Sequence, residues 1–313
     1  MTYGQFAADL LGRRFWISAY AALLIGILIP GAHPEWSFGV PTFLGGILFF
    51  TGLRLPWTDL IAAAASLARW RLVGRLCVIQ MLVLPLLVWA MVRAIAPDLA
   101  NGVLLVALMP AGMTSIAYSD LFRGDRALSL LLLVGSSLSA PFTVPLVLQT
   151  LHPSQTSMNL VSLAGQAGYI LIQLGLPLAA AQAVRAAWPE SVERHSTAWG
   201  RLAVACSCIL GGVAVVTTKG AWLHLGWSGL LEPLLVTCLA SAVFVAAGLL
   251  SARWLKRQES VAFACAIVFM NNGLGVAFAV RFFPEEPAML LPSVLMMAPM
   301  IAGTAIIGRC LRP

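Results

Sequence analysis

Ten apolar runs, separated by short polar loops, account for almost the whole chain. They fall roughly at 15–31, 37–53, 72–94, 101–123, 127–150, 159–184, 199–217, 228–252, 260–282 and 288–308. At a rise of about 1.5 Å per residue, a helix of this length crosses, or nearly crosses, a hydrocarbon core about 30 Å thick. The pattern therefore predicts an all-α membrane protein with about ten transmembrane helices.

Two of these runs, 101–123 and 260–282, are interrupted near their middles. The first contains Met109-Pro110-Ala111-Gly112-Met113-Thr114-Ser115-Ile116, and the second contains Phe269-Met270-Asn271-Asn272-Gly273-Leu274-Gly275. A proline kink repaired by neighbouring helices would explain either interruption alone. The two lie half a chain length apart, however, and broken helices at corresponding places in two halves indicate the midplane site of a secondary transporter.

The loops are short and leave no room for a soluble domain, so we expect residues 1–313 to form one membrane domain. Its two inverted five-helix repeats would span about 10–150 (helices 1–5) and about 159–310 (helices 6–10). The interrupted helices are then the fourth and the ninth, and we expect their two breaks to meet at one site near the midplane of the bilayer.

Composition and charge agree with this organisation. The chain is 60% hydrophobic and only 10% charged, whereas charged residues make up about 25% of a typical soluble domain. Assigning the loops to alternate sides places every Lys and Arg on one side except Arg93, Lys219 and Arg281. By the positive-inside rule we expect a multi-pass protein of a bacterial-type inner membrane, with cytoplasmic N and C termini.

Broken helices supply ligands through their freed ends. The N-terminal end of a half-helix favours an anion, and free carbonyl groups favour a cation such as Na⁺. The candidate substrate-binding residues are Gly112, Thr114 and Ser115 at the first break, and Asn271, Asn272 and Gly273 at the second.

Further polar residues lie within the apolar runs. Gln80 is a mid-span glutamine, which commonly bonds a neighbouring helix. Ser129 and Ser136 share one face of the fifth span, and most such hydroxyls bond back to their own helix. Asp120, the one acid within an apolar arm, is either a proton-linked carboxylate or the partner of Arg123 in an interfacial salt bridge.

The chemistry of an enzyme is not evident. The other acids and all four histidines lie in loops or at span ends, so the spans offer no buried His/Glu or His/Asp constellation. The six cysteines lie in or beside apolar runs and form no disulfide framework. We expect no cofactor other than a coupling ion, and no nucleic-acid partner.

The motifs resemble those of the bile acid:sodium symporters along most of the chain. The matching segments are Leu44-Gly45-Gly46-Ile47 through Thr51-Gly52-Leu53-Arg54-Leu55 with Asp59, Gln80 with Pro85, Met109 to Ser115, Gly124-Asp125 with Ala127-Leu128-Ser129, Ala140-Pro141, and Asn271-Asn272-Gly273-Leu274. The resemblance implies ten helices, in which a panel of helices 1, 2, 6 and 7 moves against a core of helices 3–5 and 8–10. It implies that the broken fourth and ninth helices cross within this core, near the midplane. It also implies sodium ligands at Ser115, Ser129 and Gln80.

The chain departs from the family at four other sodium ligands. Ile116 stands where the family has asparagine, Leu133 where it has a hydroxyl, Ala266 where it has glutamate and Met270 where it has glutamine. A reduced site would keep Gln80, backbone carbonyls and Asn271 as weak sodium ligands.

The sequence thus predicts a secondary transporter of an organic anion, such as a bile acid or keto acid, coupled to sodium with reduced stoichiometry. The alternatives are a sodium-independent or proton-coupled permease or efflux protein on the same fold, and a non-transporting membrane sensor. The substrate, the direction of transport and the oligomeric state stay open.

Overall fold

A computed structural model describes residues 15–31, 33–56, 58, 61, 64–151, 160–222, 226–284 and 286–311. Asp59 and both chain termini lie outside these residues. The described chain is helical, and its helices group into two compact units. One unit comprises the described residues of Met1–Trp57 and Ile172–His224; the other comprises those of Thr58–Leu171 and Leu225–Pro313.

The first unit is a small helical bundle. Its elements are α2 (Phe15–Leu28), η1 (Pro34–Phe38), α3 (Gly39–Leu53), the second half of α10 (Leu160–Ala187), α11 (Pro189–Arg194) and α12 (Ser196–Trp222). Helix α12 packs on both α2 and α3. A Cβ atom at Gly26 would lie 2.7 Å from the Gly212 carbonyl oxygen, so the backbones of α2 and α12 approach closely.

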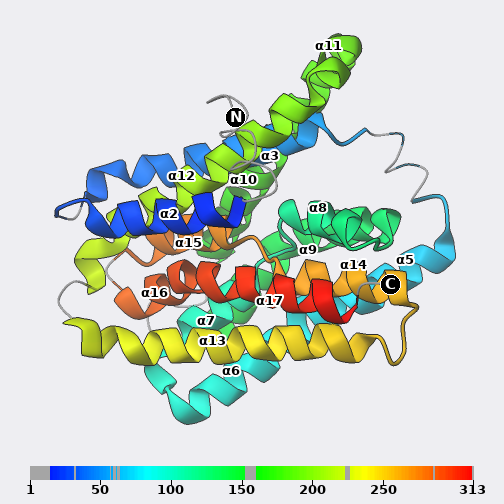
Figure 1. Cartoon of the computed structure of the whole chain (residues 1–313). Coiled ribbons are helices and arrows are strands. Elements are labelled where there is room, and N and C mark those ends of the chain that lie inside the picture. The colour runs from blue at the N-terminus through cyan, green and yellow to red at the C-terminus, as the bar shows by residue number, and fades with distance from the viewer. Residues whose placement is uncertain are drawn as a thin grey trace. The chain divides into compact units, whose positions relative to one another are not determined.

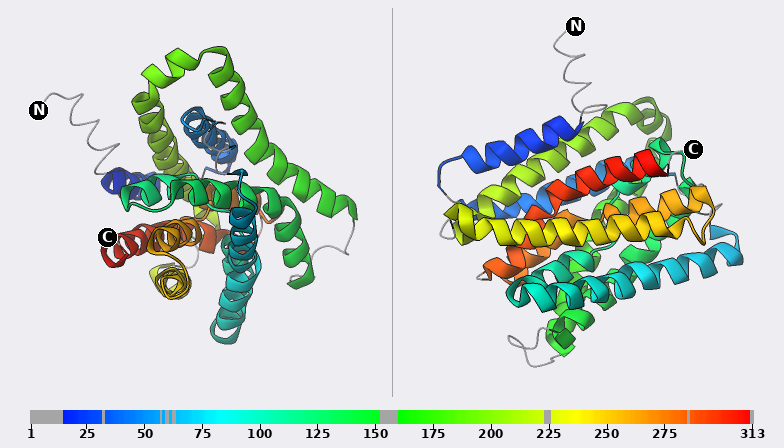
Figure 2. Two further views of the ribbon diagram at one scale, coloured as in Figure 1. Left: turned by 90° about the vertical axis from the view of Figure 1, so that its right-hand side faces the viewer. Right: turned by 60° about the horizontal axis from the view of Figure 1, so that its bottom comes forward.

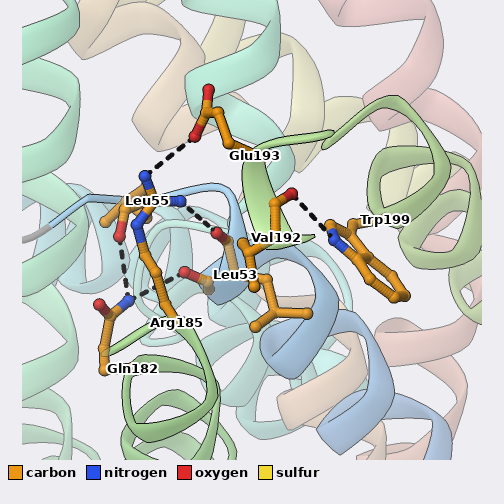
Figure 3. Close-up of polar contacts among 8 residues, drawn as sticks. Leu53, Leu55, Gln182, Arg185, Val192, Glu193 and Trp199 are labelled. Atoms are coloured by element: carbon orange, nitrogen blue, oxygen red, sulfur yellow. Dashed lines mark hydrogen bonds and ion pairs between the residues drawn. The ribbon is translucent and has the colours of Figure 1, made fainter. Parts of the chain in front are cut away.

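Side chains from α10 hold the C-terminal end of α3 (Figure 3). The Gln182 amide nitrogen donates to the carbonyl oxygens of Gly52 and Leu55, at 2.9 and 3.0 Å. The Arg185 guanidinium donates to the Leu53 carbonyl oxygen at 2.6 Å and to the Glu193 carboxylate at 3.1 Å. These donors satisfy carbonyl groups that a helix end leaves without partners.

The second unit contains both interrupted helices. Its elements are α5 (Leu67–Val78), η2 (Ile79–Val83), α6 (Leu84–Ile95), η3 (Pro97–Leu99), α7 (Ala100–Ala107), α8 (Thr114–Leu121), α9 (Arg126–Leu151), the first half of α10, α13 (Gly226–Ser251), α14 (Arg257–Val268), α15 (Asn272–Phe282), α16 (Pro287–Leu295) and α17 (Met297–Cys310). Figures 1 and 2 show α13 beside α17, and the two helices are in contact. Helix α14 lies against α8, α9 and α13.

Seven described helical stretches are long and apolar enough to cross a membrane. They correspond to seven of the predicted spans, so the chain is an all-helical, multi-pass membrane protein. The predicted spans 15–31, 101–123 and 260–282 are not among them. Within the described residues the first is a fourteen-residue helix, α2, and the other two are each divided into two short helices.

A proline in α16 and a glycine in α7 allow these two helices to pack closely. Pro292 has no N–H group, so the Ala288 carbonyl one turn earlier lacks its helical partner. Gly102 of α7 lies against this Ala288 carbonyl, and a Cβ atom there would collide with it.

Gly102→Ala is therefore expected to destabilise the protein by about 1–3 kcal/mol through overpacking. Gly74→Ala in α5 is the matched control, because a Cβ atom there would meet nothing within 4 Å. The measurement is the apparent unfolding temperature in detergent. If both variants unfold at the same temperature as the parent, the contact between α7 and α16 does not require glycine at position 102.

Candidate functional site

The two interrupted helices meet at their breaks. The backbone N–H of Gly112 donates to the Phe269 carbonyl oxygen at 2.6 Å, and that of Asn271 donates to the Pro110 carbonyl oxygen at 2.8 Å. These bonds form an isolated antiparallel bridge between Ala111 and Met270. Each break thus satisfies peptide groups that the other leaves open, as a low-dielectric environment requires. The prediction that the breaks come together is confirmed.

Gly112 has a backbone role in this bridge. A Cβ atom at Gly112 would lie 2.9 Å from the Phe269 carbonyl oxygen, closer than real side chains come. Only glycine at position 112 therefore allows the backbones of the two breaks to pair at this distance. The sequence suggested Gly112 as a substrate-binding residue. The structure shows in addition that the Phe269 backbone approaches Gly112 so closely that glycine is required there. Gly273, the glycine at the other break, is half-buried.

Ser136 of α9 ties the first break to a third helix. Its hydroxyl accepts the Ala111 backbone N–H at 3.1 Å and donates to the Leu132 carbonyl oxygen at 2.7 Å. Sequence reasoning placed Ser136 on one face with Ser129 but could not foresee this partner. Removing the hydroxyl would leave a buried N–H unpaired, so we assign Ser136 to positioning of the break.

Three side chains have buried polar atoms without hydrogen-bond partners. Two of these side chains lie at the breaks, and the third lies on η2. The atoms are the hydroxyl of Ser115, the amide oxygen of Asn272, and both amide atoms of Gln80. All three side chains are at most 4% exposed. Other helical hydroxyls, such as those of Ser139, Thr218 and Thr304, donate to their own backbone. An unpaired buried polar group costs about 1–3 kcal/mol, so its presence in a folded protein needs a structural or functional reason.

The candidate residues at the breaks thus differ in what their side chains do. The Asn271 amide oxygen caps α15 by accepting the Leu274 N–H at 3.1 Å. The Asn272 amide nitrogen donates to the sulfur of Met300 at 3.1 Å, which leaves its oxygen unpaired. Thr114, at the start of α8, is half-buried.

The ends of four short helices surround the bridge. Helices α8 and α15 begin there, at Thr114 and Asn272, and α7 and α14 end there, at Ala107 and Val268. Helix N-terminal ends carry partial positive charge and C-terminal ends partial negative charge. The helix ends around the bridge can therefore stabilise an anion at two of them and a cation at the other two.

Gln80 lies in an irregular segment that the sequence pattern did not reveal. Residues Ile79–Val83 form a single turn of π-helix between α5 and α6. Such turns often occur at functional sites, and here the turn precedes Pro85, which cannot donate a helical hydrogen bond. Helix α9 packs against this turn.

Ser129 and Asp120 have partners that were not predicted. The Ser129 hydroxyl bonds the Ser119 hydroxyl at 2.8 Å and the Asp125 carbonyl oxygen at 3.0 Å. Asp120 is exposed and pairs with Arg126 at 3.9 Å, whereas the sequence suggested Arg123. The Arg126 pairing supports the salt-bridge alternative for Asp120, since the carboxylate has a cation beside it.

Sequence reasoning also missed two groups near the breaks. Tyr118 stacks on Phe269, with ring centroids 4.4 Å apart and planes 13° from parallel. The buried Ser293 hydroxyl has no hydrogen-bond partner and lies 3.3 Å from where a Cβ atom of Gly275 would be. Neither contact is encoded by local periodicity, because each joins residues of different helical segments.

Comparison with known proteins gives a consistent result. The sequence model of the "Sodium Bile acid symporter family" matches residues 41–223. The chain is 28% identical over 299 residues to the "Uncharacterized sodium-dependent transporter YocS" of Bacillus subtilis, covering 93% of this chain and 87% of that protein. It is 24% identical over 313 residues to the "Probable sodium/metabolite cotransporter BASS1, chloroplastic" of Arabidopsis thaliana, covering 97% of this chain and 75% of that protein.

Proposed function

Since the chain belongs to the sodium bile acid symporter family, we propose that it is a secondary transporter of an organic anion whose binding site is the crossing of its two broken helices. The observation that carries the proposal is the backbone bridge between the breaks, with the unpaired polar atoms of Ser115 and Asn272 beside it. Two helix N-terminal ends and a buried hydroxyl suit a carboxylate or sulfonate group. Bile acids and keto acids both carry such a group.

We propose further that the chain has ten spans in two inverted repeats. The two divided helices and α2 would supply the three spans beyond the seven long apolar stretches. The compact units support this organisation: the first contains the segments expected for helices 1, 2 and 7 and part of helix 6, and the second contains the remainder. The proposed division into panel and core agrees with these units except for helix 6, which is divided between them.

The sodium site in this proposal is reduced. Gln80 has an unpaired buried amide oxygen and fits a sodium ligand, with Asn271 and backbone carbonyls as weaker contributors. Ser115 also has a free hydroxyl, but Ile116 and Leu133 are buried and apolar, and the Ser129 hydroxyl already bonds Ser119. These neutral groups would bind one Na⁺. The charge of the bound ion would offset part of the negative charge of the substrate.

A sodium-independent or proton-coupled permease is the second candidate. It is favoured by Ala266, which is 1% exposed where the family resemblance implies a carboxylate. A buried cation without any carboxylate beside it is weakly bound.

A thermal-shift experiment tests the proposed substrate class. Purified protein is heated with taurocholate or pyruvate, each in sodium chloride and in choline chloride. A ligand that binds only the folded state raises the apparent unfolding temperature. We expect at least one anion to stabilise the protein, and more strongly with sodium. Equal shifts in both salts favour the sodium-independent candidate, and no shift with any organic anion contradicts the proposal.

The expected topology is tested by reporter fusions after Gly12 and at Pro313. Both fusions should report a cytoplasmic location, because the loops on that side carry nearly all Lys and Arg. Two external reporters would contradict this orientation, and reporters on opposite sides would contradict an even number of spans.

A further inference from the structure

One end of the second unit carries basic side chains that pair with no acid among the described residues. Arg253 and Lys256, in the turn between α13 and α14, and Arg309, near the end of α17, are all exposed. We call these three residues the basic end. Figure 1 shows this turn beside the end of α17. The Arg257 guanidinium joins the two segments by donating to the Leu311 carbonyl oxygen at 2.8 Å.

The geometry of this end is fixed by further contacts. The hydroxyls of Ser251 and Ser260 are 2.6 Å apart, which holds the end of α13 against the start of α14. A Cβ atom at Gly248 would lie 2.8 Å from Ala264 and 3.6 Å from Ile307, so α13, α14 and α17 converge. The basic end is therefore a preformed surface.

The nearby acids are already engaged. Glu259 accepts the Lys256 backbone N–H at 3.0 Å. Asp125, whose N–H bonds the Gln258 carbonyl oxygen, has Arg69 at 3.9 Å and accepts the Leu128 N–H at 3.0 Å. Within the described part of the chain, no ion pair involves a residue of the basic end. Its positive charge is left for an external anion.

Exposed apolar side chains adjoin the basic end. Trp254 is 54% exposed in the same turn, with its ring edge-on to Phe263 at 6.2 Å. Leu250 of α13 is 49% exposed and Ile306 of α17 is 46% exposed. We call these three residues the apolar strip; each lies one to three positions along the chain from a residue of the basic end. Tryptophan in this position is typical of the bilayer interface, where its amphipathic ring is stable.

We propose that the basic end and the apolar strip dock an anionic phospholipid. Its phosphate would lie among Arg253, Lys256 and Arg309, and its acyl chains would cover Leu250 and Ile306. A soluble acidic protein would match the charges but would leave the apolar strip uncovered. Basic clusters next to transmembrane helices attract anionic headgroups in this way. The lipid would bind independently of the substrate, so this proposal is separate from the transport function proposed above.

The test compares lipids on purified full-length protein in neutral detergent. Phosphatidylglycerol should raise the apparent unfolding temperature and bind in native mass spectrometry, whereas phosphatidylethanolamine and inorganic phosphate should do neither. The variant Arg253→Gln/Lys256→Gln/Arg309→Gln should bind phosphatidylglycerol about 100-fold more weakly, since it removes three headgroup contacts.

The matched control is Arg93→Gln/Arg194→Gln/Arg201→Gln, which removes the same charge elsewhere on exposed helix ends. It should bind phosphatidylglycerol like the parent. Equal binding of phosphatidylglycerol and phosphatidylethanolamine by the parent would overturn the proposal. So would equal losses in the two variants, or stabilisation by inorganic phosphate alone. Ser115 and Asn272 are intact in both variants, so failure here leaves the transport proposal untouched.

Discussion

Ser115→Ala is expected to lower transport at least tenfold while raising the unfolding temperature of the ligand-free protein. The Ser115 hydroxyl is buried without a partner, so its desolvation costs about 1–3 kcal/mol that no hydrogen bond offsets. Alanine removes that cost. If the hydroxyl binds substrate, alanine also removes a ligand group, and the two effects have opposite signs. A purely structural serine would not give this combination.

The measurements are uptake of taurocholate and pyruvate into proteoliposomes and the apparent unfolding temperature. Ser139→Ala is the matched control, because its hydroxyl donates to the Gly135 carbonyl oxygen. It should transport like the parent. Ser136→Ala should instead destabilise, since it leaves the Ala111 N–H unpaired. If Thr114→Ala, Ser115→Ala, Asn271→Ala and Asn272→Ala all transport like the parent, the site lies elsewhere.

Sodium dependence is expected to saturate only at high concentration, with a Hill slope near one. A carboxylate 4 Å from Na⁺ contributes about 4 kcal/mol at an effective dielectric near 20, before its own desolvation is subtracted. Ala266 supplies no such charge, and Gln80 is a neutral ligand. We therefore expect one weakly bound sodium ion in each transport cycle. A Hill slope near two at low millimolar sodium would refute this stoichiometry.

Ala266→Glu should restore part of the missing attraction and lower the sodium concentration needed for half-maximal uptake. Position 266 is 1% exposed, so the variant could fail to fold; Ala266→Gln, of nearly the same volume but neutral, controls for size. Tighter sodium activation in the glutamate variant alone is the expected result. Complete indifference of the parent to sodium would favour the proton-coupled alternative, for which Asp120→Asn is the next variant.

Much of the helical architecture follows from local sequence. Apolar runs predict membrane helices because burial in hydrocarbon requires every peptide group to bond within its own segment. Pro110, Gly112 and the Asn271-Asn272 pair interrupt two such runs, so both breaks were predictable. Their meeting was predictable as well, because an open peptide group in a membrane needs a partner.

The particular contacts were not predictable. The π-turn at Gln80 and the preceding helix α5 both pack against α9, and hydrophobic periodicity does not report such tertiary packing. Ser136 and Ser129 share a helix face, yet one bonds a break and the other bonds Ser119. Such choices depend on which neighbour lies opposite, which is tertiary information.

We propose that substrate binds where the two breaks meet. Equilibrium binding of radiolabelled taurocholate and pyruvate, in sodium chloride, to the purified parent and to Ser115→Ala/Asn272→Ala tests this proposal. We predict that the parent binds at least one of these anions and that the double variant, with unchanged helical content, binds it at least tenfold more weakly. Binding by the double variant with the parent's affinity, or binding of neither anion by the parent, would contradict the claim.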